Sequence, residues 1–121
     1  MPNTEPLILL PEILEERLAA DALALALRIP EDLTYFSGHF PGMPIVPGVV
    51  QIHWAVHFAR QYWGIRLSFH HMEAVKFKNL ILPGQRLTLS LRWLASAYKL
   101  EFDFHSDIQA YSAGRIYFQG E

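Results

Sequence analysis

The sequence contains no cysteine, which excludes disulfide bonds, a thiol nucleophile and thiolate metal sites, and which fits the cytoplasmic location that we expect. The sequence also has no excess of basic residues, since its formal net charge is -2. This charge gives nucleic acid or an anionic membrane surface no electrostatic attraction as a partner. The apolar run Leu7–Leu10 stops at Pro11, and no stretch approaches the roughly 20 apolar residues that cross a bilayer. We therefore expect neither a targeting segment nor a membrane span.

The composition is that of a globular protein, with 51% hydrophobic and only 18% charged residues. It is apolar enough to indicate a further buried surface, such as a subunit interface. No repeat, low-complexity tract or linker divides the chain, and 121 residues suit one domain. We therefore expect a single domain over 1–121.

Residues 48–63 predict one long helix, because Pro47 stands at its start and Gly64 is suited to a left-handed C-cap. Its first three turns are apolar on nearly every side, so we expect this helix to be buried. Residues 31–47 are too rich in Pro and Gly for a regular element and predict a structured loop.

The remaining segments predict strands. Ala and Leu alternate with period two over 22–29, and apolar and polar residues alternate over 86–94 and over 98–105, where Tyr98 begins the apolar face. Further strands are expected over 71–78 and 108–118, whereas 12–19 suits a helix and a strand equally. Consecutive strands with short turns predict an antiparallel meander with one apolar face. We therefore expect an α+β fold whose sheet wraps around the helix.

The segment from Gly38 to Val50 reads GHFPGMPIVPGVV. It resembles the signature of the bacterial 3-hydroxyacyl-(acyl carrier protein) dehydratases, which have the hotdog fold. The motifs Val75–Phe77, Leu82–Gln85 and Ser112–Arg115 follow in the order expected for that family, so the resemblance covers roughly residues 35–118. The stretch 48–55 is similar to a divergent subgroup associated with aryl-polyene-type pathways.

The resemblance implies a hotdog domain that forms a homodimer or a larger homo-oligomer, with the long helices packed in the middle and sites shared between subunits. It also implies dehydration of a 3-hydroxyacyl thioester carried on the phosphopantetheine of an acyl carrier protein, in fatty-acid or polyene-type biosynthesis. No cofactor is implied.

The residues suit this chemistry, which needs a base, an acid for the leaving oxygen, and donors for a negatively charged thioester oxygen. His39 is our candidate for the base, since histidine transfers protons near neutral pH. Pro47 and Gly48 open the helix, whose free N–H groups and dipole suit an oxyanion. Gly48 has no side chain, so a substrate carbonyl can come close. The expected substrate-binding residues are Pro47, Gly48, Val49, Phe40 and His57.

The chain departs from the family at His53, where relatives hold Glu or Asp, and at His57, where they usually hold Gln. His53 can still donate a hydrogen bond to the leaving hydroxyl, but it supplies no carboxylate. The alternative is that His53 only packs or caps at an interface. The His53 and His57 spacing also suits a metal, but Trp54 stands where a catalytic Glu would be needed and no third ligand is evident. We therefore expect no metal.

Most of the other basic and aromatic residues allow two interpretations. Scattered basic residues form either a docking patch for an acidic carrier protein or ordinary solvated charge, and they are Arg60, Arg66, Lys76, Lys78, Arg86 and Arg115. The neighbouring histidines His70 and His71 suit a solvated strand start. The aromatic residues of the helix are expected in the core or in a dimer interface, and they are Trp54, Phe58, Tyr62 and Trp63.

Two rival functions stay open. A hotdog thioesterase would need water activated by His39 or by an acidic residue, for which Glu73 is the nearby candidate. A non-catalytic acyl-binding or partner subunit would keep the loop and lack the acid, and His53 is the residue that keeps this interpretation open.

Overall fold

The computed structural model describes residues 7–37 and 42–120. Within these residues, six strands form one sheet and one long helix crosses it. The elements follow in the order β1 (Glu12–Leu18), β2 (Ala22–Arg28), η1 (Thr34–Phe36), α1 (Gly48–Trp63), β3 (Phe69–Phe77), β4 (Arg86–Leu94), η2 (Ala95–Ala97), β5 (Lys99–His105) and β6 (Ala110–Phe118).

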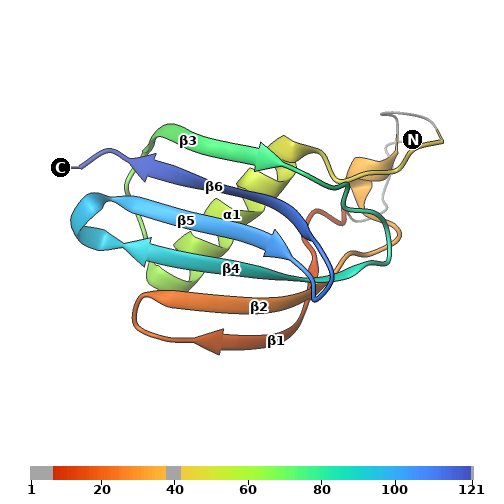
Figure 1. Ribbon diagram of the computed structural model, residues 1–121, viewed down its shortest axis with the longest axis horizontal. Coiled ribbons are helices and arrows are strands. Elements are labelled where there is room, and N and C mark those ends of the chain that lie inside the picture. Colours follow the sequence, from red (N-terminus) through yellow and green to blue (C-terminus); the bar gives the residue numbers. More distant parts are fainter. Residues whose placement is uncertain (1–6, 38–41, 121) are drawn as a thin grey trace.

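All neighbouring strands are antiparallel, in the spatial order β1-β2-β4-β5-β6-β3 (Figure 1). The expectation of one continuous meander is therefore wrong for β3, which pairs with β6 at the far edge instead of with β4. The reason is the connection through α1, which carries the chain from β2 across the sheet before β3 begins. Only β4, β5 and β6 follow one another as a meander.

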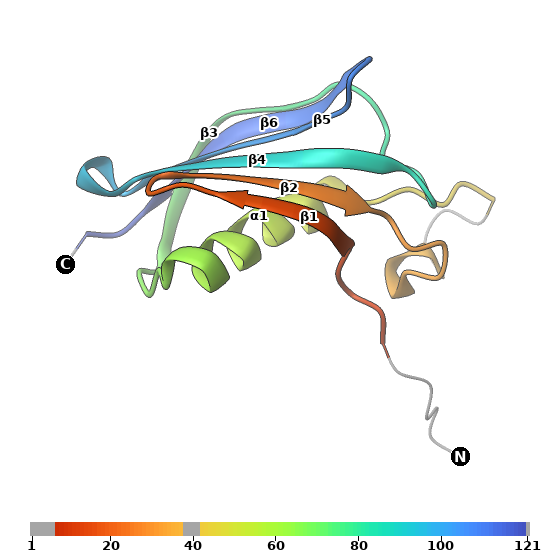
Figure 2. The same cartoon turned by 90° about the horizontal axis from the view of Figure 1, so that it is seen from below.

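The apolar rows of the sheet face α1. Leu25 of β2 pairs with Leu89 of β4, which pairs with Phe104 of β5, and all three side chains are fully buried. Trp54 and Phe58 of α1 pack into the same core. Figure 2 shows α1 along one face of a sheet that curves over it. The prediction of an α+β fold with the sheet wrapped around one helix is confirmed.

The bounds predicted for the helix are confirmed. Pro47 is the N-cap, and Gly64 takes the left-handed conformation at φ 65°, where its N–H donates to Arg60 O at 2.9 Å. Within this one chain, the sheet covers one side of α1 only, so the expected burial of the helix between subunits stays a prediction. Val49 is 74% exposed and His53 is also exposed.

Three further expectations are settled by the backbone. Residues 12–19, which suited two elements, form the exposed edge strand β1. Tyr98 does not begin the apolar face of β5, because it ends the η2 turn with φ 51° and is exposed. Ser106 N–H donates to Gln109 O in a turn, so β6 begins at Ala110 and not at residue 108 as expected. In the part of the chain that is described, no helix is long and apolar enough to cross a membrane.

The aromatic residues of α1 divide into two groups. Trp54 and Phe58 lie in the core, as one of the two expectations had it. Tyr62 and Trp63 are half-buried and connect the end of the helix to the β1–β2 hairpin. Tyr62 donates its hydroxyl hydrogen to the Glu16 carboxylate, and Trp63 Nε1–H donates to Ala20 O at 3.0 Å.

Candidate active site at the helix start

The first turn of α1 offers free backbone donors. Val50 N–H and Gln51 N–H both donate to Pro47 O, at 3.0 and 3.1 Å. The N–H groups of Gly48 and Val49 have no acceptor among residues 7–37 and 42–120, and no side chain there caps this end of the helix. Two unpaired donors at the positive end of a helix dipole are suited to bind an anionic oxygen.

Phe77 of β3 packs against Gly48. A Cβ atom built on Gly48 would lie 2.7 Å from the tip of the Phe77 ring, which is closer than any real side chain permits. The Phe77 ring therefore occupies the space that a side chain at position 48 would need.

His53 and His57 lie on neighbouring turns of α1. His53 is exposed, whereas His57 is half-buried with its ring edge-on to Phe58 at 5.2 Å between centroids. Burial lowers the pKa of His57, and the neighbouring His53 charge lowers it further. His57 is therefore held in its neutral form, in which one ring nitrogen donates and the other accepts.

His39 and Phe40 lie outside the described residues. Of the other expected site residues, Pro47, Gly48 and Val49 lie together at the start of α1, and His53 and His57 follow on later turns of the same helix. None of the described histidines, aspartates and glutamates gathers into a group of three or more that would hold a metal ion.

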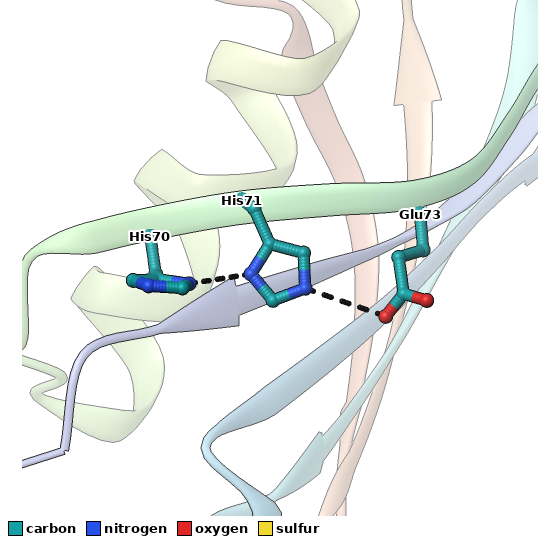
Figure 3. Close-up of polar contacts among 3 residues, drawn as sticks. All are labelled: His70, His71 and Glu73. Atoms are coloured by element: carbon teal, nitrogen blue, oxygen red, sulfur yellow. Dashed lines mark hydrogen bonds and ion pairs between the residues drawn. The ribbon is translucent and has the colours of Figure 1, made fainter.

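Glu73 belongs to a separate cluster on the edge strand β3. Figure 3 shows His71 between His70 and Glu73, with one ring nitrogen toward each. Hydrogen bonds from His71 and Tyr117 lower the pKa of Glu73. Glu73 pairs in register with Arg115, which alternates with the buried Ile116, so this pair lies on the sheet face away from α1. The acid considered for a thioesterase is thus not brought to the start of α1.

The six basic residues do not form one patch on the described surface. Arg60 is held at the end of α1, where it donates to Ile65 O at 3.2 Å and lies over the Phe118 ring. Arg115 lies on the outer face of the sheet. A groove of about 760 Å³ crosses that outer face, lined in part by Ala24, Ser90 and Arg115, and is therefore on the opposite side of the sheet from α1.

The sequence interpretation missed Gln51, the one helix residue that is both polar and buried in this region. Its side chain is 3% exposed and hydrogen-bonds to Val46 and Ser112. The available signal was a polar residue within the apolar run of Gly48–Trp63, on the same helical face as the core residues Trp54 and Phe58.

Comparison with known proteins identifies a family whose members this chain resembles. Residues 15–115 match the model of a family described as ApeI-like, ApeI dehydratase. The chain is 28% identical over 132 residues to the 3-hydroxyacyl-(acyl-carrier-protein) dehydratase FabZ of Ruminiclostridium cellulolyticum, covering 100% of this chain and 87% of that protein. It is 30% identical over 102 residues to the FabZ dehydratase of Syntrophobacter fumaroxidans, covering 78% of this chain and 68% of that protein.

A solved structure has the same architecture. The dehydratase heterocomplex ApeI:P from Xenorhabdus doucetiae matches with a TM-score of 0.85 and 32% identity, covering 91% of this chain and 98% of that chain. This chain has one antiparallel sheet packed on one helix. Its similarity to the solved structure confirms the expected hotdog fold.

Proposed function

Because the chain belongs to the ApeI-like dehydratase family, we propose that it dehydrates a 3-hydroxyacyl thioester with His39 as the base and His53 as the proton donor. The chain is a dehydratase of the lyase class, and its reaction belongs to fatty-acid or polyene-type biosynthesis. The observation that supports the residue roles is the pair of N–H groups on Gly48 and Val49, which have no acceptor among the described residues and shortly follow the His-Phe-Pro-Gly motif in the sequence.

The reaction requires charge stabilisation at one oxygen and proton transfer at two positions. His39 takes the proton from the carbon next to the thioester carbonyl, and negative charge then develops on the carbonyl oxygen. The N–H groups of Gly48 and Val49 stabilise that oxygen, where the helix dipole adds to their effect. The bond from the next carbon to its hydroxyl breaks, and the departing hydroxide takes a proton from His53. The products are water and a 2-enoyl thioester.

The substrate carrier and the assembly are part of this proposal. We expect the thioester to be carried on an acyl carrier protein, as the names of the FabZ relatives state for those proteins, and to be attached through its phosphopantetheine. We also propose that the chain forms one hotdog domain that assembles into a homodimer or a larger homo-oligomer. The exposed Val49 and His53 on the uncovered side of α1 support a site completed by a second subunit. A cytoplasmic location stays a prediction.

In the test, the purified protein is given two thioesters, each bound to a carrier protein or to pantetheine. A 3-hydroxyacyl thioester should lose one water, as measured by mass spectrometry, and a saturated acyl thioester should release no free thiol. Thiol release from the saturated substrate would indicate a thioesterase instead.

A second candidate, a non-catalytic acyl-binding subunit, is favoured by His53, which stands where the family resemblance implies a carboxylate. Such a subunit would change neither substrate, yet an acyl-pantetheine would still raise its melting temperature because the ligand binds only the folded state. Loss of water from the hydroxyacyl substrate would exclude this candidate.

A further inference from the structure

Two polar side chains are buried between α1 and the sheet. Gln51 is 3% exposed and Ser112 of β6 is 2% exposed, and they are the buried polar residues among those described. Ser112 Oγ lies 2.6 Å from Gln51 Oε1, and Gln51 Nε2 lies 3.1 Å from Val46 O. A buried polar group is costly unless it is hydrogen-bonded, so each of these groups depends on the next one.

The chemistry of the three groups fixes the direction of both hydrogen bonds. The carbonyl of Val46 can only accept, so the amide nitrogen of Gln51 must be the group that faces it. The amide oxygen of Gln51 then faces Ser112, whose hydroxyl must donate. The Val46 carbonyl therefore determines which way the Gln51 amide is turned, and the Ser112 hydroxyl satisfies the amide oxygen.

The backbone held in this way leads directly into α1. Val46 is fixed from the other side as well, because its N–H donates to Ile81 O at 2.9 Å. Gln51 contacts this segment a second time through its own backbone N–H, which donates to Pro47 O at 3.1 Å. The two consecutive carbonyls before Gly48 are thus both held by Gln51. The Pro47 carbonyl shares its peptide plane with the Gly48 N–H, so holding this segment fixes the direction of that donor. The Val49 N–H belongs to the next peptide plane of the helix that starts from it.

We propose that Gln51 is a positioning residue for the oxyanion donors, and that Ser112 acts through it. Gln51 touches no reacting atom in this arrangement, and its effect on the reaction is through the direction of the two N–H groups. The inference rests on the proposed function, because it assigns to those N–H groups the stabilisation of the thioester oxygen. A misplacement of about 1 Å in a site can lower a rate about 100-fold, so a buried residue of this kind can control turnover.

The test compares Gln51→Met, which keeps the size of the side chain and removes both hydrogen bonds, with the wild type. We expect kcat to fall by about 10- to 100-fold while KM changes by less than about 3-fold, since the donors act on the transition state. Ser112→Ala should give a smaller fall in kcat, because the amide of Gln51 then loses one partner and keeps its hydrogen bond to Val46 O. The matched control is Ile116→Val, which truncates the same core without touching the network.

A spectroscopic measurement separates positioning from general loss of stability. A 2-enoyl pantetheine thioester labelled with ¹³C at its carbonyl is bound to each variant, and the carbonyl stretch is read by difference infrared spectroscopy. Wild type and Ile116→Val should lower the stretch frequency because the N–H groups polarise the carbonyl, and Gln51→Met should lose most of that shift. Should Gln51→Met fail to fold, Ser112→Ala is read in the same way and should lose part of the shift.

Equal kcat and equal carbonyl shift in Gln51→Met and wild type would overturn the inference. An equal loss in Ile116→Val would also overturn it, because the effect would then be one of stability alone. A wild-type protein that binds the enoyl thioester but dehydrates nothing would refute the proposed function. The carbonyl shift in the variants would then still decide whether Gln51 positions the donors.

Discussion

His57 lies one helical turn beyond His53 on α1, and its pKa is lowered by its own burial and then by the charge of His53. A charge on His53 therefore disfavours a charge on His57. If His53 is the group that holds a proton for the leaving hydroxyl, a neutral His57 beside it is the arrangement that the geometry favours.

The first prediction follows from the lowered pKa of His57. In the unfolded chain His57 takes up a proton as the pH falls below about 6.5, whereas in the folded chain it does so only at lower pH. The unfolded state then binds more protons, so the free energy of unfolding should decrease as the pH falls from about 6.5 toward the lowered pKa. Urea unfolding at a series of pH values measures this slope.

The control for this prediction is His57→Gln, which places the family's usual residue at the position. The slope between pH 6.5 and the lowered pKa should become smaller in this variant, since the titrating group is gone. An unchanged slope would mean that other groups account for the pH dependence.

The second prediction concerns His39. His39→Ala should abolish dehydration of a 3-hydroxyacyl thioester, because the base is removed, and it should leave the melting temperature nearly unchanged, because the residue belongs to a segment rich in Pro and Gly. Turnover is measured by mass spectrometry, and the fold by circular dichroism. A variant that keeps most of its activity would place the base elsewhere.

Local sequence signals were sufficient for much of the fold. The helix bounds follow from Pro47 and Gly64, whose backbone preferences act within one turn of the chain. The alternation over 22–29 and 86–94 predicted β2 and β4, because a period of two directly determines which side chains face the core. In both cases the determining residues lie inside the element that they determine.

Long-range pairing could not be predicted in the same way. β3 has exposed residues at nearly every position, so nothing in its pattern indicates β6 as its partner. The network of Gln51 was also missed, because Ser112 lies 61 residues away in sequence and becomes a partner only once α1 packs on β6. The roles of His39 and Phe40 stay predictions.

The third prediction concerns Gly48 and Phe77. Gly48→Ala would bring a Cβ to 2.7 Å from the ring tip of Phe77, but that ring is half-exposed and can move aside. We therefore expect a loss of only about 1 kcal/mol in the free energy of unfolding. In a Phe77→Ala background the same change should cost nothing, which a double-mutant cycle measures. Equal costs in the two backgrounds would contradict the contact.

The fourth prediction concerns assembly. The uncovered side of α1 carries Val49 and His53, and the composition is apolar for a chain with one sheet. The protein should therefore have at least twice its monomer mass of 13.9 kDa in light scattering. A monomer at the concentrations used for activity assays would remove the shared site from the proposal.

The last prediction separates the roles open to His53. If His53 donates the proton to the departing hydroxide, His53→Ala should lower the rate of dehydration by about 10²- to 10⁴-fold, which is the usual contribution of a positioned acid. His53→Glu places the family's carboxylate at the same position and should keep or raise the rate. Both variants should fold, because His53 is exposed and no hydrogen bond or ion pair of its side chain occurs within the described residues. If His53→Ala dehydrates as fast as wild type, His53 has no part in proton transfer, and a role in packing against the partner subunit would be the one left to it.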